Sequence, residues 1–100
     1  MVKKLRIVID NEAKKSLRKA YEYIKKDSLS NAEKVRQKIL SSIKALARNP
    51  GQHGLDKYRK DNDGTFRAYE VYKYRITYHL GEDEIHIIRI HHTKMNPLKY

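Results

Sequence analysis

The sequence predicts a two-layer α+β fold in which a helical hairpin packs on one face of a four-stranded, mainly antiparallel sheet. Three observations predict it. Two segments with helical periodicity follow one another closely, three strand-like segments come after them, and one short alternating segment precedes them. The order is therefore β-α-α-β-β-β. A chain of 100 residues can bury one modest core, so we expect residues 1–100 to form a single domain.

The first half of the chain supplies one strand and both helices. Residues 4–9 read KLRIVI, alternate in polarity and are rich in β-branched side chains, which predicts the first strand. Asp10 is placed to cap a helix over residues 11–26, whose apolar positions recur every three or four residues. The sequence SNAE matches a capping box and predicts that Ser30 caps a second helix over residues 31–48, which the sequence NPG ends. Helices joined by so few residues should form an antiparallel hairpin.

The second half supplies a loop and three strands. Residues 50–64 are polar, lack periodicity and end in the turn signal DNDG, so they predict a loop. Strands are predicted over residues 65–71, 74–80 and 85–92, separated by a tight turn and by the acidic turn GEDE. Strands joined by such short turns pair as an antiparallel meander. The first strand must join this sheet, and the helical hairpin then covers one face and leaves the other open.

The charge of the chain is its strongest compositional feature. Lys and Arg number 23 against 12 Asp and Glu, which gives a net charge of +11. Such a balance favours a polyanionic partner, either nucleic acid or an acidic protein segment, although a solvated basic helix face has the same composition. The chain has no cysteine, no apolar run near the roughly 20 residues of a membrane span, and no signal-peptide cleavage site. We therefore expect a cytoplasmic protein that does not bind membranes.

Strand alternation assigns side chains to the two faces of the sheet. The apolar parity should meet the helices, and the polar parity should lie on the open face, where an outward arginine contributes little to core packing. The expected inward set is Phe66, Ala68, Tyr74, Ile76, Tyr78, Leu80, Ile88 and Ile90. The expected open face, with its neighbouring loops, carries Arg67, Tyr69, Arg75, Thr77, His79, Ile87, Arg89, His91, Lys57, Arg59, Lys60 and Lys94.

The open face has the composition of a phosphate-binding site. Arginines on adjacent strands repel one another unless an anion compensates them, and guanidinium groups bind phosphate through two hydrogen bonds. Interleaved tyrosine and histidine can stack on unpaired bases. The alternative is an ordinary surface on which Asp56, Glu70 and the acids at 82–84 pair with the arginines. The adjacent His91 and His92 point to opposite faces, and no Cys or carboxylate set completes a metal site, so we expect neither a metal nor another cofactor. His53, alone in the loop, has no expected chemical role.

The order of elements, the NPG exit, the strand YRITY at 74–78 and the terminal IIRIHHTKMNP at 87–97 together resemble the RelE/ParE superfamily. The resemblance covers nearly the whole chain. Members are small bacterial toxins of type II toxin–antitoxin modules, some of them of the plasmid-stabilisation type. RelE-like members cut mRNA in the ribosomal A site, whereas ParE-like members inhibit DNA gyrase and are not nucleases. The resemblance thus implies a cognate antitoxin as partner, with the ribosome and its mRNA, or alternatively DNA gyrase, as target.

The resemblance also implies site residues. Arg75 occupies the position of an arginine that stabilises the transition-state phosphate in RelE-like nucleases, and Lys94 and Tyr100 occupy those of a second basic residue and a C-terminal tyrosine. His91 or His92 would serve as base or acid. The strand-two lysines of RelE are absent. The phosphate-binding or RNA-binding set would be Arg67, Arg89, Lys94, Lys57, Lys60 and Tyr69.

The basic charge and the Arg/His face favour a ribosome-dependent, metal-independent mRNA endonuclease. The C-terminal motif, which ParE-like proteins share, supports the alternative of a non-enzymatic gyrase inhibitor. A degenerate member that retains only antitoxin binding is a third reading.

Overall fold

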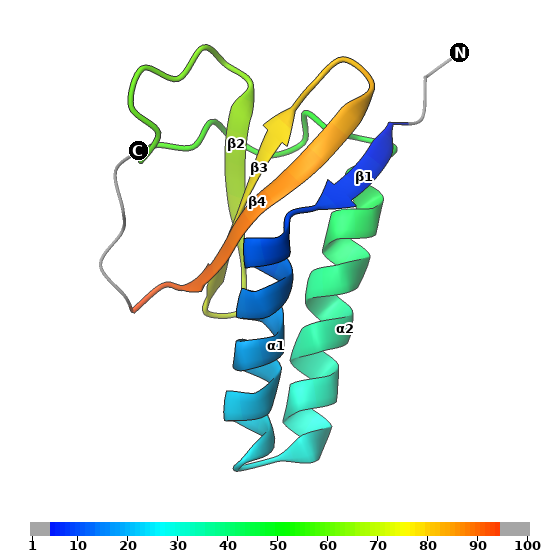
Figure 1. Ribbon diagram of the computed structural model, residues 1–100, viewed down its shortest axis with the longest axis vertical. Coiled ribbons are helices and arrows are strands. Elements are labelled where there is room, and N and C mark those ends of the chain that lie inside the picture. Colours follow the sequence, from blue (N-terminus) through cyan, green and yellow to red (C-terminus); the bar gives the residue numbers. More distant parts are fainter. Residues whose placement is uncertain (1–4, 95–100) are drawn as a thin grey trace.

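The computed structural model describes residues 5–94 and confirms the predicted order of elements and the two-layer architecture (Figure 1). No helix in this range is long and apolar enough to cross a membrane. The six elements are β1 (Arg6–Ile9), α1 (Asn11–Lys25), α2 (Leu29–Ala45), β2 (Phe66–Val71), β3 (Tyr74–Leu80) and β4 (Glu84–His92).

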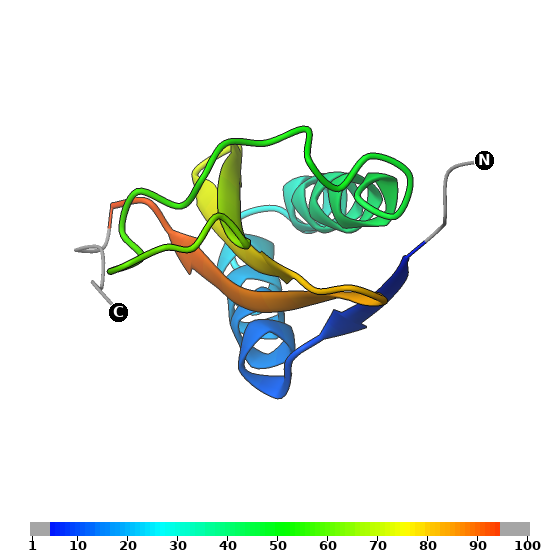
Figure 2. The same cartoon turned by 90° about the horizontal axis from the view of Figure 1, so that it is seen from above.

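The sheet is mixed, with strand order β1-β4-β3-β2. Strands β2, β3 and β4 form the predicted antiparallel meander, and β1 lies parallel to β4. Strand β1 pairs only with the first half of β4, from Glu84 to Ile87. Helix α1 follows β1 directly and contacts β4, while α2 runs antiparallel to α1 and reaches β2 (Figures 1 and 2).

The two helix starts differ in how they are capped. Asp10 is the N-cap residue of α1, but its carboxylate makes no capping hydrogen bond and its Oδ1 lies 3.4 Å from His86 Nδ1 instead. Helix α2 starts earlier than predicted, because Ser28 adopts an extended conformation and its Oγ accepts a hydrogen bond from the Asn31 N–H at 3.1 Å. The prediction that Ser30 caps α2 is therefore wrong.

The core lies between the helical hairpin and one face of the sheet. Ile39 and Ile43 of α2 meet Ile76 and Tyr78 of β3, which are both fully buried as predicted. In β4 the pairing register shifts beside Thr77 and Tyr78. Such a β-bulge adds one residue to a strand and moves the following side chains to the other face.

The predicted side-chain directions are wrong in two strands. Because of the bulge, Ile87 is buried in the core, whereas the sequence placed it on the open face. Ile88, which was expected in the core, is the extra residue of the bulge and lines a cleft with Arg89 and His91. In β2 the opposite parity faces the helices: Tyr69 pairs with Ile76 and its hydroxyl lies 2.9 Å from Ser42 Oγ of α2. Arg67 has the same parity as Tyr69. Alternation divides the side chains of β2 into two sets on opposite faces of the sheet. It does not determine which set faces the helices, because each set contains an aromatic side chain.

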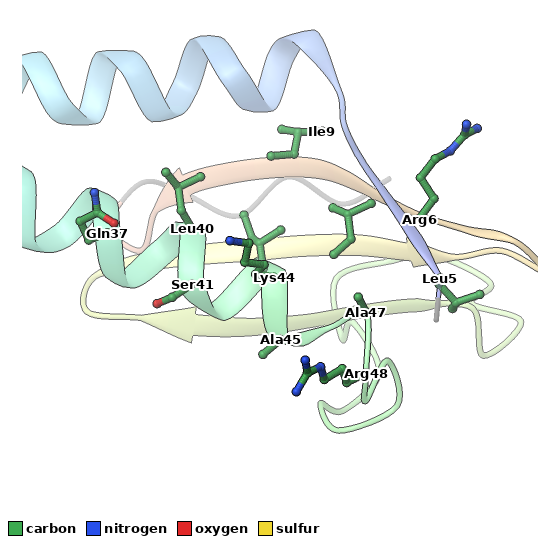
Figure 3. Close-up of a pocket in the computed structure, with 12 residues that line it drawn as sticks. Leu5, Arg6, Ile9, Gln37, Leu40, Ser41, Lys44, Ala45, Ala47 and Arg48 are labelled. Atoms are coloured by element: carbon green, nitrogen blue, oxygen red, sulfur yellow. The ribbon is translucent and has the colours of Figure 1, made fainter. Parts of the chain in front are cut away.

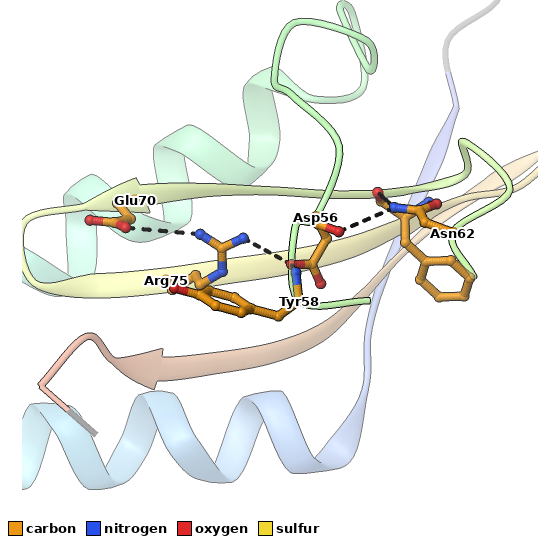
Figure 4. A network of polar contacts seen from close by, with 6 residues as sticks. Asp56, Tyr58, Asn62, Glu70 and Arg75 are labelled. Carbon is orange, nitrogen blue, oxygen red and sulfur yellow. Dashed lines mark hydrogen bonds and ion pairs between the residues drawn. The ribbon is translucent and has the colours of Figure 1, made fainter. Parts of the chain in front are cut away.

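The loop between α2 and β2 wraps around β2. On the helix side, Tyr78 donates its hydroxyl proton to Pro50 O at 2.7 Å, and the His53 ring stacks on Tyr69 with centroids 3.9 Å apart. The chain then runs along the β2 edge, where Ala68 N–H donates to Gly54 O at 3.1 Å. Residues 54–62, which we call the covering segment, continue onto the other face of the sheet (Figure 4). The face predicted to be open is therefore partly covered.

Candidate functional site

Arg75 lies on the face opposite the core, as predicted, but it is buried, with 8% of its surface exposed. Its Nη2 donates a 2.8 Å hydrogen bond to Asp56 Oδ1, and the Asp56 side chain is completely buried (Figure 4). The Tyr58 ring lies 4.8 Å from the guanidinium, and Glu70 Oε2 lies 3.9 Å from Nη1. The expectation of an exposed arginine is thus wrong. Of the acids named in the alternative, Asp56 and Glu70 pair with Arg75, whereas Glu84 pairs with Arg6.

Asp56 is held in place by the covering segment itself. Its Oδ1 also accepts from the Tyr58 N–H at 3.1 Å, and its own N–H donates to Phe66 O at 2.9 Å. The Asn62 side chain donates to Phe66 O at 2.7 Å and so fixes the end of the segment (Figure 4). Because buried charges are tolerated only when paired and hydrogen-bonded, this network makes Arg75 a structural anchor of the covering segment.

His91 and Arg89 lie on the same face as Arg75. His91 is the cross-strand partner of Arg75, and Arg89 is the partner of Thr77. Burial lowers the pKa of His91, and the nearby charges of Arg89 and Arg75 lower it further, so the imidazole is neutral at pH 7. Its Nδ1 is buried and finds no hydrogen-bond partner within residues 5–94. Both residues line a cleft of about 860 Å³ between β4 and the N-terminus of α1. A neutral histidine beside an arginine can exchange a proton next to a bound anion.

Arg67 and Tyr69 are not part of this face. Tyr69 is packed between α2 and His53, and burial raises its pKa to about 12. Arg67 Nη1 donates to His53 O at 2.6 Å. The prediction that these residues join Arg75 on the open face is wrong, because β2 has the opposite parity. His53, for which no chemical role was expected, has a packing role.

His92 is directed away from His91. Its ring meets Tyr74 edge-on at 5.1 Å, and its Nδ1 accepts a hydrogen bond from the Lys94 N–H at 3.1 Å. Of the two histidines, only His91 lies on the Arg75 face.

The remaining predicted residues are dispersed. Lys57, Lys60 and Lys94 are exposed, and Lys57 Nζ lies 5.2 Å from the Tyr58 ring. Tyr100 lies outside the described residues. Among residues 5–94, no three His, Cys, Asp or Glu side chains are close enough to hold a metal ion.

Comparison with known proteins identifies the family. The model of the ParE toxin of the type II toxin-antitoxin system, parDE, matches residues 7–97. The chain belongs to the ParE toxin family. No curated protein matched this toxin.

Solved structures of toxins share the fold. A chain of the chromosomal ParDE TA system from P. aeruginosa is 20% identical, with a TM-score of 0.71, over 91% of this toxin and 98% of that chain. The YoeB dimer from Staphylococcus aureus is 19% identical with a TM-score of 0.55, and the YoeB-YefM complex from the same organism is 19% identical with a TM-score of 0.53. Each of these two covers 86% of this toxin and 93% of its own chain. These likenesses show that the toxin shares its fold with the solved toxins.

The toxin also carries a basic groove away from Arg75. A hollow of about 1030 Å³ between α2 and β1 is lined by apolar side chains such as Leu5, Ile9 and Leu40 (Figure 3). Lys44 and Arg48 lie at its border, and no acidic residue of the described chain lines it. A smaller hollow of about 300 Å³ between the helices shares Ile9 and Leu40, and it is bordered by Lys14, Arg18 and Arg36.

Proposed function

We propose that this toxin acts by binding a protein target, as a ParE-like inhibitor of DNA gyrase, and does not cleave RNA. The observation that carries the proposal is the state of Arg75. The resemblance to RelE-like nucleases would put this arginine at the reacting phosphate, but its guanidinium is already neutralised by Asp56 and covered by Tyr58. Arg67 and Tyr69, which would bind RNA beside it, face the helices. The match to the ParE family supports the same reading.

A ribosome-dependent endonuclease is the second candidate, and His91 favours it. Cleavage needs a base to activate a 2′-hydroxyl and cations to stabilise the charged phosphorane. His91 is neutral, lies beside Arg89, and its buried Nδ1 has no hydrogen-bond partner within residues 5–94. Lys94 follows at the end of β4. This candidate uses the cleft between β4 and α1 and does not require Arg75.

We propose that a cognate antitoxin binds this toxin in the basic groove between α2 and β1. An apolar floor with cations at its border and no acid fits an acidic, amphipathic protein segment, which buries its apolar side and pairs its carboxylates. We propose that the toxin acts in the cytoplasm, where both candidate targets and the antitoxin would be located.

The test is to express the toxin from a tightly controlled promoter and examine both targets in the same cells. A gyrase inhibitor should produce gyrase-linked DNA breaks or altered supercoiling while RNA 5′ ends stay unchanged. The purified toxin should also inhibit supercoiling by purified gyrase. New 5′ ends within translated codons, with supercoiling intact, would establish the nuclease instead.

His91→Gln is the matched variant. It keeps the polarity and approximate size of the side chain but cannot transfer a proton at neutral pH. A gyrase inhibitor should tolerate it, whereas a nuclease that uses His91 should lose about 10²-fold or more in cleavage rate.

A further inference from the structure

Three of the exposed large apolar side chains belong to the tip of the helical hairpin and to the β2–β3 turn. Tyr23 is 67% exposed, Leu29 54% and Tyr72 52%. They belong to the end of α1, the start of α2 and the β2–β3 turn; in Figure 1 the two helix ends form the tip of the hairpin, and the β2–β3 turn lies beside α1 above that tip. Leu55, which is also 54% exposed, forms an isolated antiparallel β-bridge with Arg67 near the other end of β2. Exposed large apolar side chains that lie near one another indicate a binding surface more than scattered ones do.

Tyr74 connects Tyr23 with the turn. It is the first residue of β3, and its ring meets the His92 ring edge-on at 5.1 Å. Burial raises the pKa of Tyr74, and the Tyr23 phenol raises it further, so the hydroxyl of Tyr23 on α1 lies within electrostatic range of Tyr74. Tyr72 precedes Tyr74 by two residues. We call the set Tyr23, Tyr72, Tyr74 and His92 the aromatic patch.

The backbone of Tyr72 makes the patch unusual. Tyr72 has a φ of 54°, in the left-handed region where a bulky side chain costs energy and where Gly or Asn is preferred. Its side chain is half exposed and so contributes little to the core that could offset this cost. Non-glycine residues in such conformations are concentrated at functional sites.

The charges around the patch define what it can bind. Lys19 precedes Tyr23 by four residues, Lys26 follows it by three, and Lys73 lies next to Tyr72 in the turn. All three are exposed, as are the acids Glu22, next to Tyr23, and Asp27, next to Lys26. None of the three lysines forms an ion pair with another residue of the range 5–94. Tyrosine is enriched among the residues that dominate protein–protein binding energies. Unpaired lysines around a tyrosine favour association with an acidic surface of a partner protein.

We propose that the aromatic patch is the surface by which this toxin contacts an acidic region of its protein target. The proposal rests on the proposed function, because it assumes a toxin that acts by binding. The patch shares no residue with the basic groove between α2 and β1, so the two surfaces can be altered independently.

The experiment compares Tyr23→Ser/Tyr72→Ser and Lys73→Glu with the matched control Leu55→Ser, which removes an equally exposed apolar side chain elsewhere. Growth arrest on induction is the readout that does not presuppose a target, and binding to purified gyrase holoenzyme is the second. The Tyr23→Ser/Tyr72→Ser variant, and the Lys73→Glu variant next to the patch, should each bind gyrase at least about tenfold more weakly and lose growth arrest, while Leu55→Ser stays within about twofold of the wild type. Thermal unfolding of each variant checks that the fold is kept.

Folded patch variants that still arrest growth as the wild type does would overturn the patch, whatever the target. If the wild type arrests growth without binding gyrase, the proposed function fails. The patch then stands only if its variants, and not Leu55→Ser, lose growth arrest.

Discussion

Replacing Arg75 by Met should destabilise the toxin strongly, because it leaves the Asp56 carboxylate buried without a partner. The paired charges are 2.8 Å apart, with side-chain exposures of 10% and 0%. At an effective dielectric constant of about 20, such charges attract by roughly 6 kcal/mol. Desolvation offsets much of this in the intact pair, but removing one partner from a buried pair typically costs about 3–5 kcal/mol. The half-exposed Glu70, 3.9 Å away, cannot replace the arginine because it has the same sign as Asp56.

The measurement is the free energy of unfolding from urea denaturation followed by circular dichroism. For a domain of this size, a loss of about 3 kcal/mol corresponds to a fall in Tm of more than roughly 12 °C. The double variant Asp56→Asn/Arg75→Met removes both charges and should recover at least half of the loss. Arg18→Met, on the exposed face of α1, is the matched control and should change stability by less than about 0.5 kcal/mol. A folded Arg75→Met protein with wild-type stability but no toxicity would refute the structural role and return Arg75 to the active site.

Three smaller predictions follow from contacts described above. Tyr69→Phe removes the hydrogen bond to Ser42 and should cost about 1 kcal/mol in urea unfolding, and the Tyr69 phenol should titrate near pH 12 in a spectrophotometric titration. NMR titration should give His91 a pKa below 6.5. Because the unfolded state then binds more protons than the folded state, the free energy of unfolding should fall as the pH drops below 6.5. The His91→Gln variant should lack that part of the fall. Ser28→Ala should lower stability by about 1 kcal/mol, whereas Ser30→Ala, outside the cap, should leave it nearly unchanged.

The elements themselves could be predicted from local sequence. Strand β3 has the predicted bounds because its alternation is regular and the turn at Tyr72 and Lys73 is short. The start of α2 could not be fixed in the same way, because Ser28 and Ser30 are both good N-cap residues. Glu33, which supported the capping box, instead accepts a hydrogen bond from the Tyr21 hydroxyl at 2.6 Å.

The candidate site was harder to predict because it depends on long-range contacts. Alternation placed Arg75 on the correct face, but its burial comes from Asp56, which is 19 residues earlier in a loop without periodicity. Asp56 is one of three aspartates in a loop that also holds three basic residues, so the sequence did not single it out as the partner of Arg75. The β4 bulge left no comparable signal, since Ile87 and Ile88 are identical in type.

The loop that wraps around β2 also affects how the toxin behaves at high concentration. An edge strand with unpaired N–H and C=O groups can pair with the edge of another molecule and start aggregation. Here the N–H groups of Ala68 and Asp56 and the carbonyls of Gly54 and Phe66 are paired with one another across the β2 edge. Among the described strands, this leaves β1 as the edge without such cover. Loss of the Arg75–Asp56 pair would therefore expose the unpaired backbone groups of β2 as a second edge that can pair with another molecule. Variants that loosen the loop should thus precipitate before they unfold completely.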